Sequence, residues 1–270
     1  MIDLHCHLLP GTDDGAPDEA VSLAMARIAV ADGIGVLACT PHVYPGVFEN
    51  DTVAITAAVA RLQARLDSEG IGLRLTIGAD AHLTPELLGR LGDRTVPTLA
   101  GSRYFLLEPP HHVAPPRFEQ AVFDFLVAGY VPVITHPERL SWIAQHYASF
   151  QNVVRAGAWL QVTAGSLNGR FGSGAQRFAD KLLDDGLVHV LATDAHSIRH
   201  RPPLLTEGWK AAEKWVGTDE AYRLVVERPQ AVLDNRPPQQ VAPVPALRDG
   251  QVNPQRRGFL ARLAGRAGKR

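Results

Sequence analysis

The sequence contains only two cysteines, Cys6 and Cys39, few aromatic residues and no long apolar run. Two cysteines cannot build the disulfide framework of a small secreted domain, and they are compatible with a reducing compartment. No apolar stretch approaches the roughly 18 residues of a membrane-spanning helix, and the N-terminal segment MIDLHCHLLPG has no basic region ahead of an apolar stretch. We therefore expect a cytoplasmic protein, and its 270 residues, 46% of them hydrophobic, suffice for a sizeable core.

The two cysteines also exclude one class of enzyme. A cysteine-dependent tyrosine phosphatase needs an arginine six positions after its cysteine, so that a thiolate attacks phosphorus while a guanidinium binds the phosphate. The residue six positions after Cys6 is Thr12, and the residue six positions after Cys39 is Pro45. That chemistry is absent, and Cys6, which alternates away from its neighbours in a strand, is expected to pack beneath the surface.

Acidic residues are scarce at the C-terminal end, where residues 236–270 hold eight basic side chains and one acid, Asp249. This tail therefore carries a charge of +7, and residues 1–235 carry −8 of the total of −1. An acidic body does not attract nucleic acid, so no nucleic-acid partner is expected. We predict one domain over residues 1–235 and a flexible tail over 236–270. The tail is first Pro-rich and then basic, and its Phe259, Leu260 and Leu263 would let it contact a membrane surface or a partner protein.

Seven β-rich runs follow one another through the body, and most are continuously apolar, as in parallel strands buried on both faces. They cover Ile2–His5, Val36–His42, Leu73–Asp80, Tyr104–Glu108, Val131–His136, Trp159–Thr163 and Val188–Asp194. Helical periodicity fills the stretches between them, namely Asp18–Ala31, Thr52–Ser68, Arg117–Ala128, Phe178–Asp185 and Leu204–Val216.

The spacing of these runs predicts the fold class. Their last residues recur every 27 to 38 positions, which is close to the length of one βα unit. Seven such units indicate an α/β fold of the (β/α) barrel type, one unit short of the usual eight. A doubly wound open sheet is the competing architecture, but the first strand is not followed by a Gly-x-Gly-x-x-Gly turn. We predict the barrel.

Potential metal ligands end six of the seven strands, where the C-terminal mouth of a barrel gathers its chemistry. Five histidines and four carboxylates converge there, a mixed N/O set of the kind that Zn²⁺, Mn²⁺ or Fe²⁺ accepts. Without metal, so many acids in one pocket would repel one another. In the loop PGTDDG we take the second aspartate rather than the first. The candidate ligands are His5, His7, Asp14, His42, Asp80, Glu108, His136, Asp194 and His196.

Two arginines flank this predicted site, Arg139 just after His136 and Arg201 just after His196. Three divalent ions with four carboxylates and one hydroxide would leave the pocket with a charge of about +1, which suits a phosphate dianion. The planar guanidinium fork also matches phosphate oxygens. We therefore expect Arg139 and Arg201 to bind phosphate, with a hydroxide that bridges two metal ions as the nucleophile and His196 as an additional catalytic group.

At these residues the sequence resembles the polymerase-and-histidinol-phosphatase (PHP) family, whose first motif Asp-x-His-x-His stands here at Asp3–His7. More narrowly, it is similar to the manganese-dependent tyrosine-protein phosphatases encoded with bacterial capsule and exopolysaccharide genes. The resemblance covers residues 1 to about 235 and rests on motifs in this order: HLLPGTDDG, TPH, GAD, THPER, TAGSLNGRFG and TDAH. It implies a distorted (β/α)7 barrel with three metal ions, Mn²⁺ foremost with Zn²⁺ or Fe²⁺ as alternatives, at its C-terminal mouth.

The resemblance further implies a grouping of ligands and a partner. His5, His7, Asp80 and Asp194 would hold one ion, Asp14, His42 and His136 a second, and Asp80, Glu108 and His196 the third. The family usually has Glu where this chain has Asp80, so metal affinity at that position is expected to differ. The implied substrate is a phosphotyrosine protein, specifically a membrane-associated bacterial tyrosine kinase that controls capsule synthesis. Nothing in the motifs opposes an oligomer.

Three alternatives stay open from the residues. A small-molecule phosphomonoesterase, such as a histidinol phosphatase, would use the same metals in a narrower pocket. An exonuclease of the polymerase-associated branch would use them on DNA, which the acidic body disfavours. A weakly active regulatory protein would have lost most turnover through Asp80 and would act through its tail.

Overall fold

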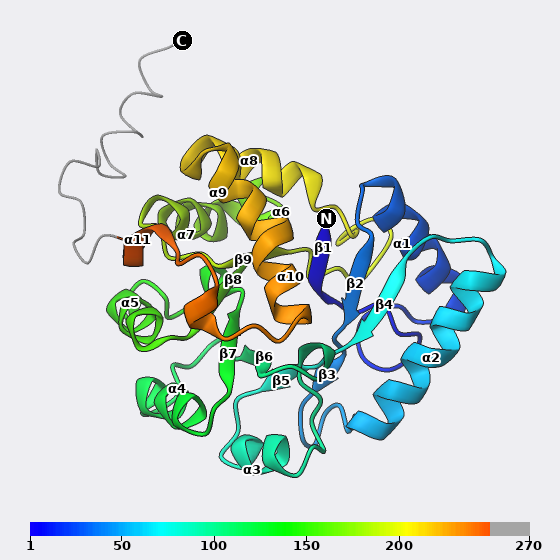
Figure 1. The fold of residues 1–270 in the computed structure, drawn as a ribbon, viewed down its shortest axis with the longest axis horizontal. Helices are drawn as coiled ribbons and strands as arrows, with labels where there is room; N and C mark the ends of the chain where they lie inside the picture. Colours follow the sequence, from blue (N-terminus) through cyan, green and yellow to red (C-terminus); the bar gives the residue numbers. More distant parts are fainter. Residues whose placement is uncertain (249–270) are drawn as a thin grey trace.

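Parallel strands in sequence order form the centre of the molecule, with helices around them (Figure 1). The computed structural model describes residues 1–248, so the predicted contact of the tail with a membrane surface or partner through Phe259, Leu260 and Leu263 lies outside the described residues. The strands are β1 (Ile2–Cys6), β2 (Val36–Cys39), β3 (His42–Val43), β4 (Arg74–Ile77), β5 (Asp80–His82), β6 (Tyr104–Glu108), β7 (Val131–Thr135), β8 (Trp159–Thr163) and β9 (Val190–Ala192).

The strands occupy the seven predicted positions, but two of the positions are interrupted. The expected strand Val36–His42 is divided into β2 and β3, and Leu73–Asp80 is divided into β4 and β5. As a result, β1-β2-β4 form one sheet and β3-β5-β6-β7-β8-β9 form another, with every neighbouring pair parallel. At the second interruption two side chains pack tightly on the backbone of Gly78, where an added Cβ would lie 2.9 Å from side-chain carbons of Leu99 and Thr40.

The first and last strands meet at their carboxyl ends. An isolated parallel bridge pairs Cys6 with Ala195, the amide of His7 donates to the Ala195 carbonyl at 2.9 Å, and the amide of Asp194 donates to the His5 carbonyl at 2.8 Å. Within residues 1–248 the two strands share no longer ladder. The fold is therefore a distorted seven-position (β/α) barrel, and the predicted class is confirmed.

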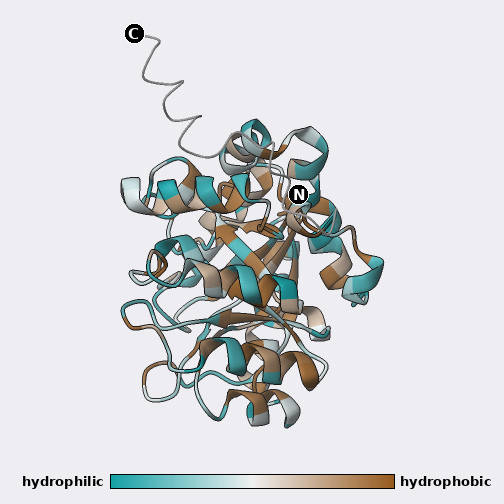
Figure 2. Ribbon diagram, turned by 90° about the vertical axis from the view of Figure 1, so that its left-hand side faces the viewer, coloured by the Kyte–Doolittle hydropathy of each residue, from teal (hydrophilic) through white to brown (hydrophobic). Residues whose placement is uncertain are grey.

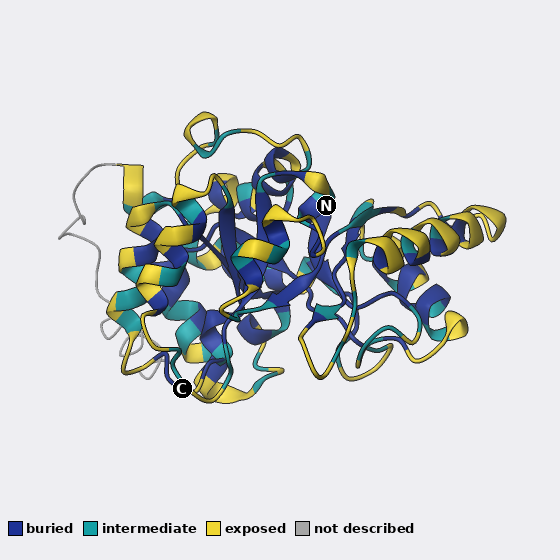
Figure 3. Ribbon diagram, turned by 90° about the horizontal axis from the view of Figure 1, so that it is seen from below, coloured by how far each residue is buried: buried dark blue, intermediate teal, exposed yellow. Residues whose placement is uncertain are grey.

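The helices begin where the sequence supplies caps. Helix α1 (Glu19–Ala31) is capped by Asp18, whose carboxylate accepts from the Val21 amide, and α2 (Thr52–Ser68) is capped in the same way by Asp51. Their buried faces pack on the strands while their outer faces are exposed (Figure 3). The other helices are α3 (Leu87–Gly92), α4 (Phe118–Val127), α5 (Tyr147–Ala156), α6 (Ala164–Leu167), α7 (Gly172–Asp184), α8 (Thr206–Val216), α9 (Thr218–Tyr222), α10 (Arg228–Leu233) and α11 (Pro245–Arg248).

The barrel interior changes from apolar to polar along its axis. Its lower part is a cluster of buried apolar side chains that alternate along the strands: Ile2, Leu4, Tyr104, Leu106, Val131, Val133, Trp159 and Val190. The strands are correspondingly hydrophobic in Figure 2. Above this cluster, at the carboxyl ends of the strands, the buried side chains are histidines and carboxylates. The fold thus places a polar layer on a packed apolar one.

The opposite end of the barrel is closed by the C-terminal helices. Helix α10 crosses this end in Figure 1 and inserts Val232 into the apolar cluster. Its first residue, Arg228, is fully buried and donates to Glu220 at 2.6 Å and to the carbonyls of Ala242, Pro243 and His189. Each contact satisfies part of the guanidinium, so this buried charge is paired.

Part of the predicted tail packs against the body. The short 3₁₀ helix Pro238–Gln240 and α11 follow α10, and Val244 is fully buried in the main core. Arg248 also forms an ion pair with Glu220. The domain boundary after residue 235 stays a prediction, but the segment that follows it, up to residue 248, is ordered against the barrel by these contacts. None of the helices among residues 1–248 is long and apolar enough to cross a bilayer.

Candidate metal centre

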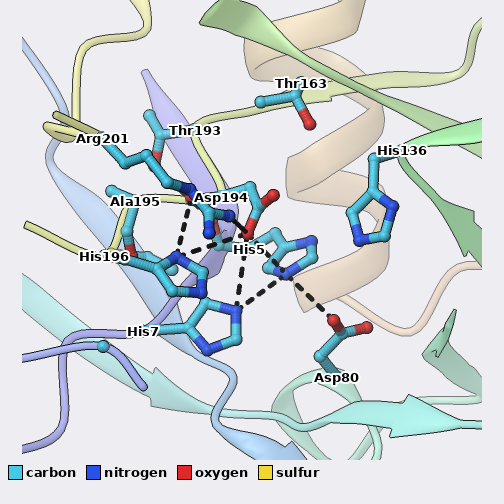
Figure 4. Close-up of polar contacts among 12 residues, drawn as sticks. His5, His7, Asp80, His136, Thr163, Thr193, Asp194, Ala195, His196 and Arg201 are labelled. Atoms are coloured by element: carbon cyan, nitrogen blue, oxygen red, sulfur yellow. Dashed lines mark hydrogen bonds and ion pairs between the residues drawn. The ribbon is translucent and has the colours of Figure 1, made fainter. Parts of the chain in front are cut away.

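A bulge in β1 directs His5, and His7 just after the strand, to the mouth of the barrel. Asp3 pairs with Leu37 and Cys6 pairs with Cys39, so β1 has one residue more than β2 between the two pairs. Such an extra residue changes the direction of the side chains that follow. Leu4 lies in the apolar cluster, and His5 and His7 point together into the polar layer, with their Nε2 atoms 3.2 Å apart (Figure 4).

The first group of candidate ligands surrounds His5. Its Nε2 lies 3.4 Å from an oxygen of Asp80 and 3.4 Å from an oxygen of Asp194, and His7 Nε2 lies 3.5 Å from the same Asp194 oxygen. Figure 4 shows these side chains converging from β1, β5 and the end of β9. Two ligands that each lie about 2.1 Å from one ion are at most about 4.2 Å apart. The separations therefore suit a shared cation.

The second group lies beside the first. Glu108 ends β6, and its Oε1 lies 3.8 Å from His136 Nε2. Its Oε2 lies 3.4 Å from His42 Nδ1, which is itself 3.5 Å from Asp80 Oδ2. His111 joins this group, since one of its ring nitrogens lies within 4.8 Å of the ligand atoms of Glu108 and His136. His111 follows β6, was not among the candidate ligands, and lies at the edge of the site.

The third group is built around Asp14. One oxygen of Asp14 lies 3.5 Å from His42 Nε2 and 3.4 Å from His196 Nε2. His196 Nε2 thus belongs with Asp14 and not with Glu108, and His136 belongs with Glu108 and not with Asp14. The two histidines exchange places relative to the grouping that the resemblance implied, because His136 follows β7 beside β6, whereas His196 follows β9 next to β1 and the Asp14 loop.

A set of outer contacts holds the histidines in position. Gln161 Oε1 lies 2.9 Å from His5 Nδ1, and Asp13 Oδ2 lies 2.6 Å from His7 Nδ1. Asp13 also accepts from the amides of Gly15 and His42, both at 2.9 Å. Partners of this kind fix the ring orientation of metal-binding histidines. Asp13 was visible in the sequence as the first aspartate of PGTDDG, where Asp14 was preferred as a ligand, whereas a glutamine inside a strand offered no signal for Gln161.

Asp3, the first residue of the Asp-x-His-x-His motif, has a different place. Its carboxylate accepts from the backbone amide of Thr193 at 3.0 Å and from the Thr193 hydroxyl. These bonds join β1 to the residue that precedes Asp194. Burial raises the pKa of Asp3 to about 6, although the bonds from Thr193 act in the opposite direction. Asp3 therefore aligns the two strand ends that carry His5 and Asp194.

The buried carboxylates of the cluster favour positive charge next to them, as the pKa shifts of their neighbours indicate. Burial alone disfavours charged imidazoles, yet the negative charges of Asp80 and Asp194 raise the pKa of His5 to about 9. Burial opposes charge in His42 too, but its contact with Glu108 and the charge of Asp80 raise its pKa to about 10. Burial and the nearby charge of Glu108 raise the pKa of Asp80. Neighbouring carboxylates thus attract positive charge into this layer.

Unsatisfied polar atoms give an independent test of fit. Both carboxylate oxygens of Asp80 and Nδ1 of His136 are buried without a hydrogen-bond partner. Leaving buried polar atoms unpaired costs stability, so such atoms are rare in native interiors unless a ligand or water meets them. Carboxylate oxygens and imidazole nitrogens within 4.8 Å of one another are a donor set for divalent cations. The residues present therefore fit a metal centre.

The two predicted arginines lie at the edge of this layer. Arg139 contacts Oδ2 of Asp194, and Arg201 lies 2.7 Å from its Oδ1 (Figure 4 shows Arg201). Both guanidinium groups sit over the ring of Phe171, at 4.4 Å and 5.6 Å from its centroid. Phe171 directly precedes α7 and was not singled out from the sequence, although its motif TAGSLNGRFG was. One aromatic ring therefore holds both cations beside the cluster.

Comparison with known proteins gives a consistent result. Residues 1–234 match the family model described as capsular polysaccharide synthesis, CpsB/CapC. Tyrosine-protein phosphatase YwqE of Bacillus subtilis is 37% identical over 89% of this chain and 96% of its own length. CapC of Staphylococcus aureus is 30% identical over 77% of this chain and 81% of its own length.

A crystallographic study of YwqE from Bacillus subtilis and CpsB from Streptococcus pneumoniae, described as metal-dependent tyrosine phosphatases, provides a solved structure similar to this chain. The match has a TM-score of 0.84 and 37% identity, and it covers 88% of this chain and 96% of the solved one. The family model and the relatives agree with the resemblance carried by the sequence motifs. The chain belongs to the CpsB/CapC family.

Proposed function

We propose that this protein is a metal-dependent protein-tyrosine phosphatase whose active site is the polar layer at the barrel mouth. The observation that carries the proposal is Asp80, whose two buried oxygens have no hydrogen-bond partner while three histidines and Glu108 crowd around them. The relatives named as tyrosine-protein phosphatases and the similar metal-dependent structures support the same activity.

We assign the metal ligands from the contacts between side chains. The groups favoured by these contacts are His5, His7, Asp80 and Asp194; Asp80, Glu108 and His136; and Asp14, His42 and His196. The proposal is three divalent ions, Mn²⁺ foremost, with Zn²⁺ or Fe²⁺ as alternatives. Divalent ions supply Lewis acidity here, which lowers the pKa of water and offsets the charge of a phosphoryl group.

The arginines are proposed to bind the phosphoryl oxygens. Arg201 Nε is buried without a partner, so this donor is available to a ligand. Arg139 approaches from the segment after β7 and Arg201 from the segment after β9, so that their guanidinium groups face the cluster from the same side as Phe171. Two fixed guanidinium groups can orient the phosphoryl group and stabilise charge that develops on it.

The leaving group needs little help. A tyrosine side chain has a pKa of about 10, so a phenolate departs more readily than an alkoxide would. His196 Nδ1 contacts the Asp194 carbonyl oxygen at 3.0 Å and its Nε2 faces Asp14, which favours a ligand role. Its further role in proton transfer stays a prediction. The two cysteines are buried and do not reach the cluster as nucleophiles.

The proposed substrate is a phosphotyrosine protein of capsule synthesis. The family description and the names of the relatives support a tyrosine kinase as partner. That this kinase is membrane-associated, and that it is acted on from the cytoplasm, is part of the proposal. The net charge of −8 on residues 1–235 supports a protein and not a nucleic acid as partner.

A comparison of substrates tests this function. We expect the purified protein to release phosphate from a phosphotyrosine peptide, to lose this turnover after EDTA and to recover it with Mn²⁺. Histidinol phosphate serves as the competing substrate, and its release is expected to be slower. Faster release from histidinol phosphate would keep the metal centre and overturn the substrate. No turnover of either substrate at full metal loading would favour a regulatory protein.

A further inference from the structure

A pocket of about 400 Å³ opens directly beside the proposed metal centre. It lies between the segment after β3 and the segment after β6, and it shares His42 and Glu108 with the centre. Its volume is within the range of about 300–1,000 Å³ found for small-molecule pockets. The pocket can therefore hold the organic part of a phosphate ester whose phosphoryl group lies at the metal centre.

The walls of this pocket are apolar and aromatic. Tyr44, Val47 and Phe48 form one side, and Pro110 and Val113 form the other. Val47 is 58% exposed and Val113 is 68% exposed. Apolar side chains left exposed on both sides of an opening are typical of a binding surface. Four histidines, His42, His82, His111 and His112, and Glu108 complete the lining, which contains neither lysine nor arginine. The pocket therefore offers mainly ring faces and apolar side chains to a ligand, which suits an aromatic ring.

The aromatic wall is fixed before any ligand arrives. The Tyr44 ring stacks on His82 with centroids 3.8 Å apart, and the Phe48 ring stacks on His42 at 5.5 Å. Reciprocal backbone bonds of 3.0 and 2.8 Å join Tyr44 and Phe48 and close the turn between them. A wall that is already ordered loses little entropy when a ring packs on it.

We propose that this pocket binds the phenyl ring of phosphotyrosine while the phosphoryl group lies at the metal centre; the inference rests on the proposed function. We call it the aryl pocket and define it by Tyr44, Val47, Phe48, Pro110 and Val113. Phosphoserine would place only one methylene at the mouth of the pocket, and its apolar walls would stay exposed to water. Differences of this size in an apolar site change kcat/KM by about 10- to 200-fold. The pocket is thus a source of preference for aryl over alkyl phosphates.

The first test measures kcat/KM of the Mn²⁺-loaded protein for phenyl phosphate and for ethyl phosphate. Neither substrate has flanking peptide residues, so only the ring can reach the pocket. The variant combines Val47→Ser with Val113→Ser, both at exposed positions. The matched control is Val127→Ser. Val127 is 70% exposed, and it is the last residue of α4, at the end of the barrel opposite the pocket. We expect the double variant to lose about 5- to 20-fold with phenyl phosphate and little with ethyl phosphate, and the control to match the unsubstituted protein.

Three outcomes would overturn the aryl pocket. Equal losses with both substrates would mean that the valines support the metal centre and not the ring. No loss with either substrate would mean that the pocket is not used. A loss seen with phosphotyrosine peptides but not with phenyl phosphate would assign the pocket to a neighbouring residue of the peptide.

A binding measurement separates this inference from the proposed function. We expect phenylphosphonate, which cannot be hydrolysed at an ester bond, to bind the Mn²⁺-loaded protein more tightly than ethylphosphonate by calorimetry. The double variant should lose that preference. If the preference is present but no phosphate ester is hydrolysed, the proposed function fails and the aryl pocket stands. If esters are hydrolysed and both phosphonates bind equally, the pocket fails and the function stands.

Discussion

The two ends of the barrel bury charge in opposite ways. At the closed end, Arg228 is fully buried and donates to Glu220 and to three backbone carbonyls. At the mouth, Asp80 is equally buried, and neither of its oxygens has a hydrogen-bond partner. A buried charge that serves only the fold is paired by the fold itself. The layer at the mouth, where both oxygens of Asp80 lack a hydrogen-bond partner, is therefore best explained as a site completed by ligands.

A substitution at the closed end should have the largest effect, and this effect should be on the free energy of unfolding. Replacing Arg228 by methionine leaves Glu220 buried with Arg248 and Arg223, which are partly exposed. We expect the free energy of unfolding to fall by about 3–5 kcal/mol, the usual cost of removing one partner of a buried pair, as measured by urea denaturation.

Arg223→Met is the matched control, because Arg223 reaches the same Glu220 from the surface. It should cost less than about 1 kcal/mol. Turnover per folded molecule should be unchanged in both variants. A cost for Arg228→Met no larger than that of the control would remove the contrast between the two ends.

A substitution at the mouth should instead change metal binding and turnover. Asp80→Asn keeps the volume of the side chain and removes the charge that faces His5 and His42. We expect phosphotyrosine turnover to fall by more than about 100-fold, beyond the 10- to 100-fold cost of losing a supporting partner. The rise in melting temperature caused by Mn²⁺ should also shrink. If the variant kept both properties, Asp80 would not be a ligand.

The outer contacts should give an intermediate effect. Gln161→Leu removes the partner of His5 Nδ1, and Asp13→Asn weakens the partner of His7 Nδ1. Each change should lower metal affinity by about 10- to 100-fold, with turnover recovering at high Mn²⁺. Turnover that stayed low at saturating Mn²⁺ would argue that these residues act on the substrate and not through the histidines.

The smallest of the four effects is expected at Phe171, which lies under both arginines. Loss of these cation–π contacts costs about 0.5–2 kcal/mol, which predicts a rise in KM of about 2- to 30-fold for Phe171→Ala in steady-state assays. Phe171→Tyr keeps the ring and should restore KM. An effect on kcat alone, or no rescue by tyrosine, would contradict a positioning role.

The fold and most of the site could be predicted from the sequence because parallel strands end at one edge. The candidate ligands at residues 5, 80, 108 and 194 each follow or end an apolar run, and the spacing of those runs indicated βα units. The structure brings all four to one layer. The local sequence pattern was therefore enough to predict a candidate ligand wherever its position depends only on the strand that carries it.

Features that depend on two segments could not be predicted. The bulge that redirects His5 appears only in the pairing of β1 with β2. The partners of His136 and His196 depend on which strands are neighbours around the barrel, not on their order along the chain. Val244 packs in the main core and Arg248 pairs with Glu220, both distant in sequence, so a Pro-rich composition suggested a loose tail where the structure has an anchored segment.

The most direct test of the central claim is turnover of a phosphotyrosine peptide by protein whose metal content is measured at the same time. Protein stripped of metal should be inactive, and activity should rise with bound Mn²⁺ until the three ligand groups are filled. Asp80→Asn should bind less Mn²⁺ under the same conditions. Full turnover by protein shown by elemental analysis to be free of metal would contradict the account.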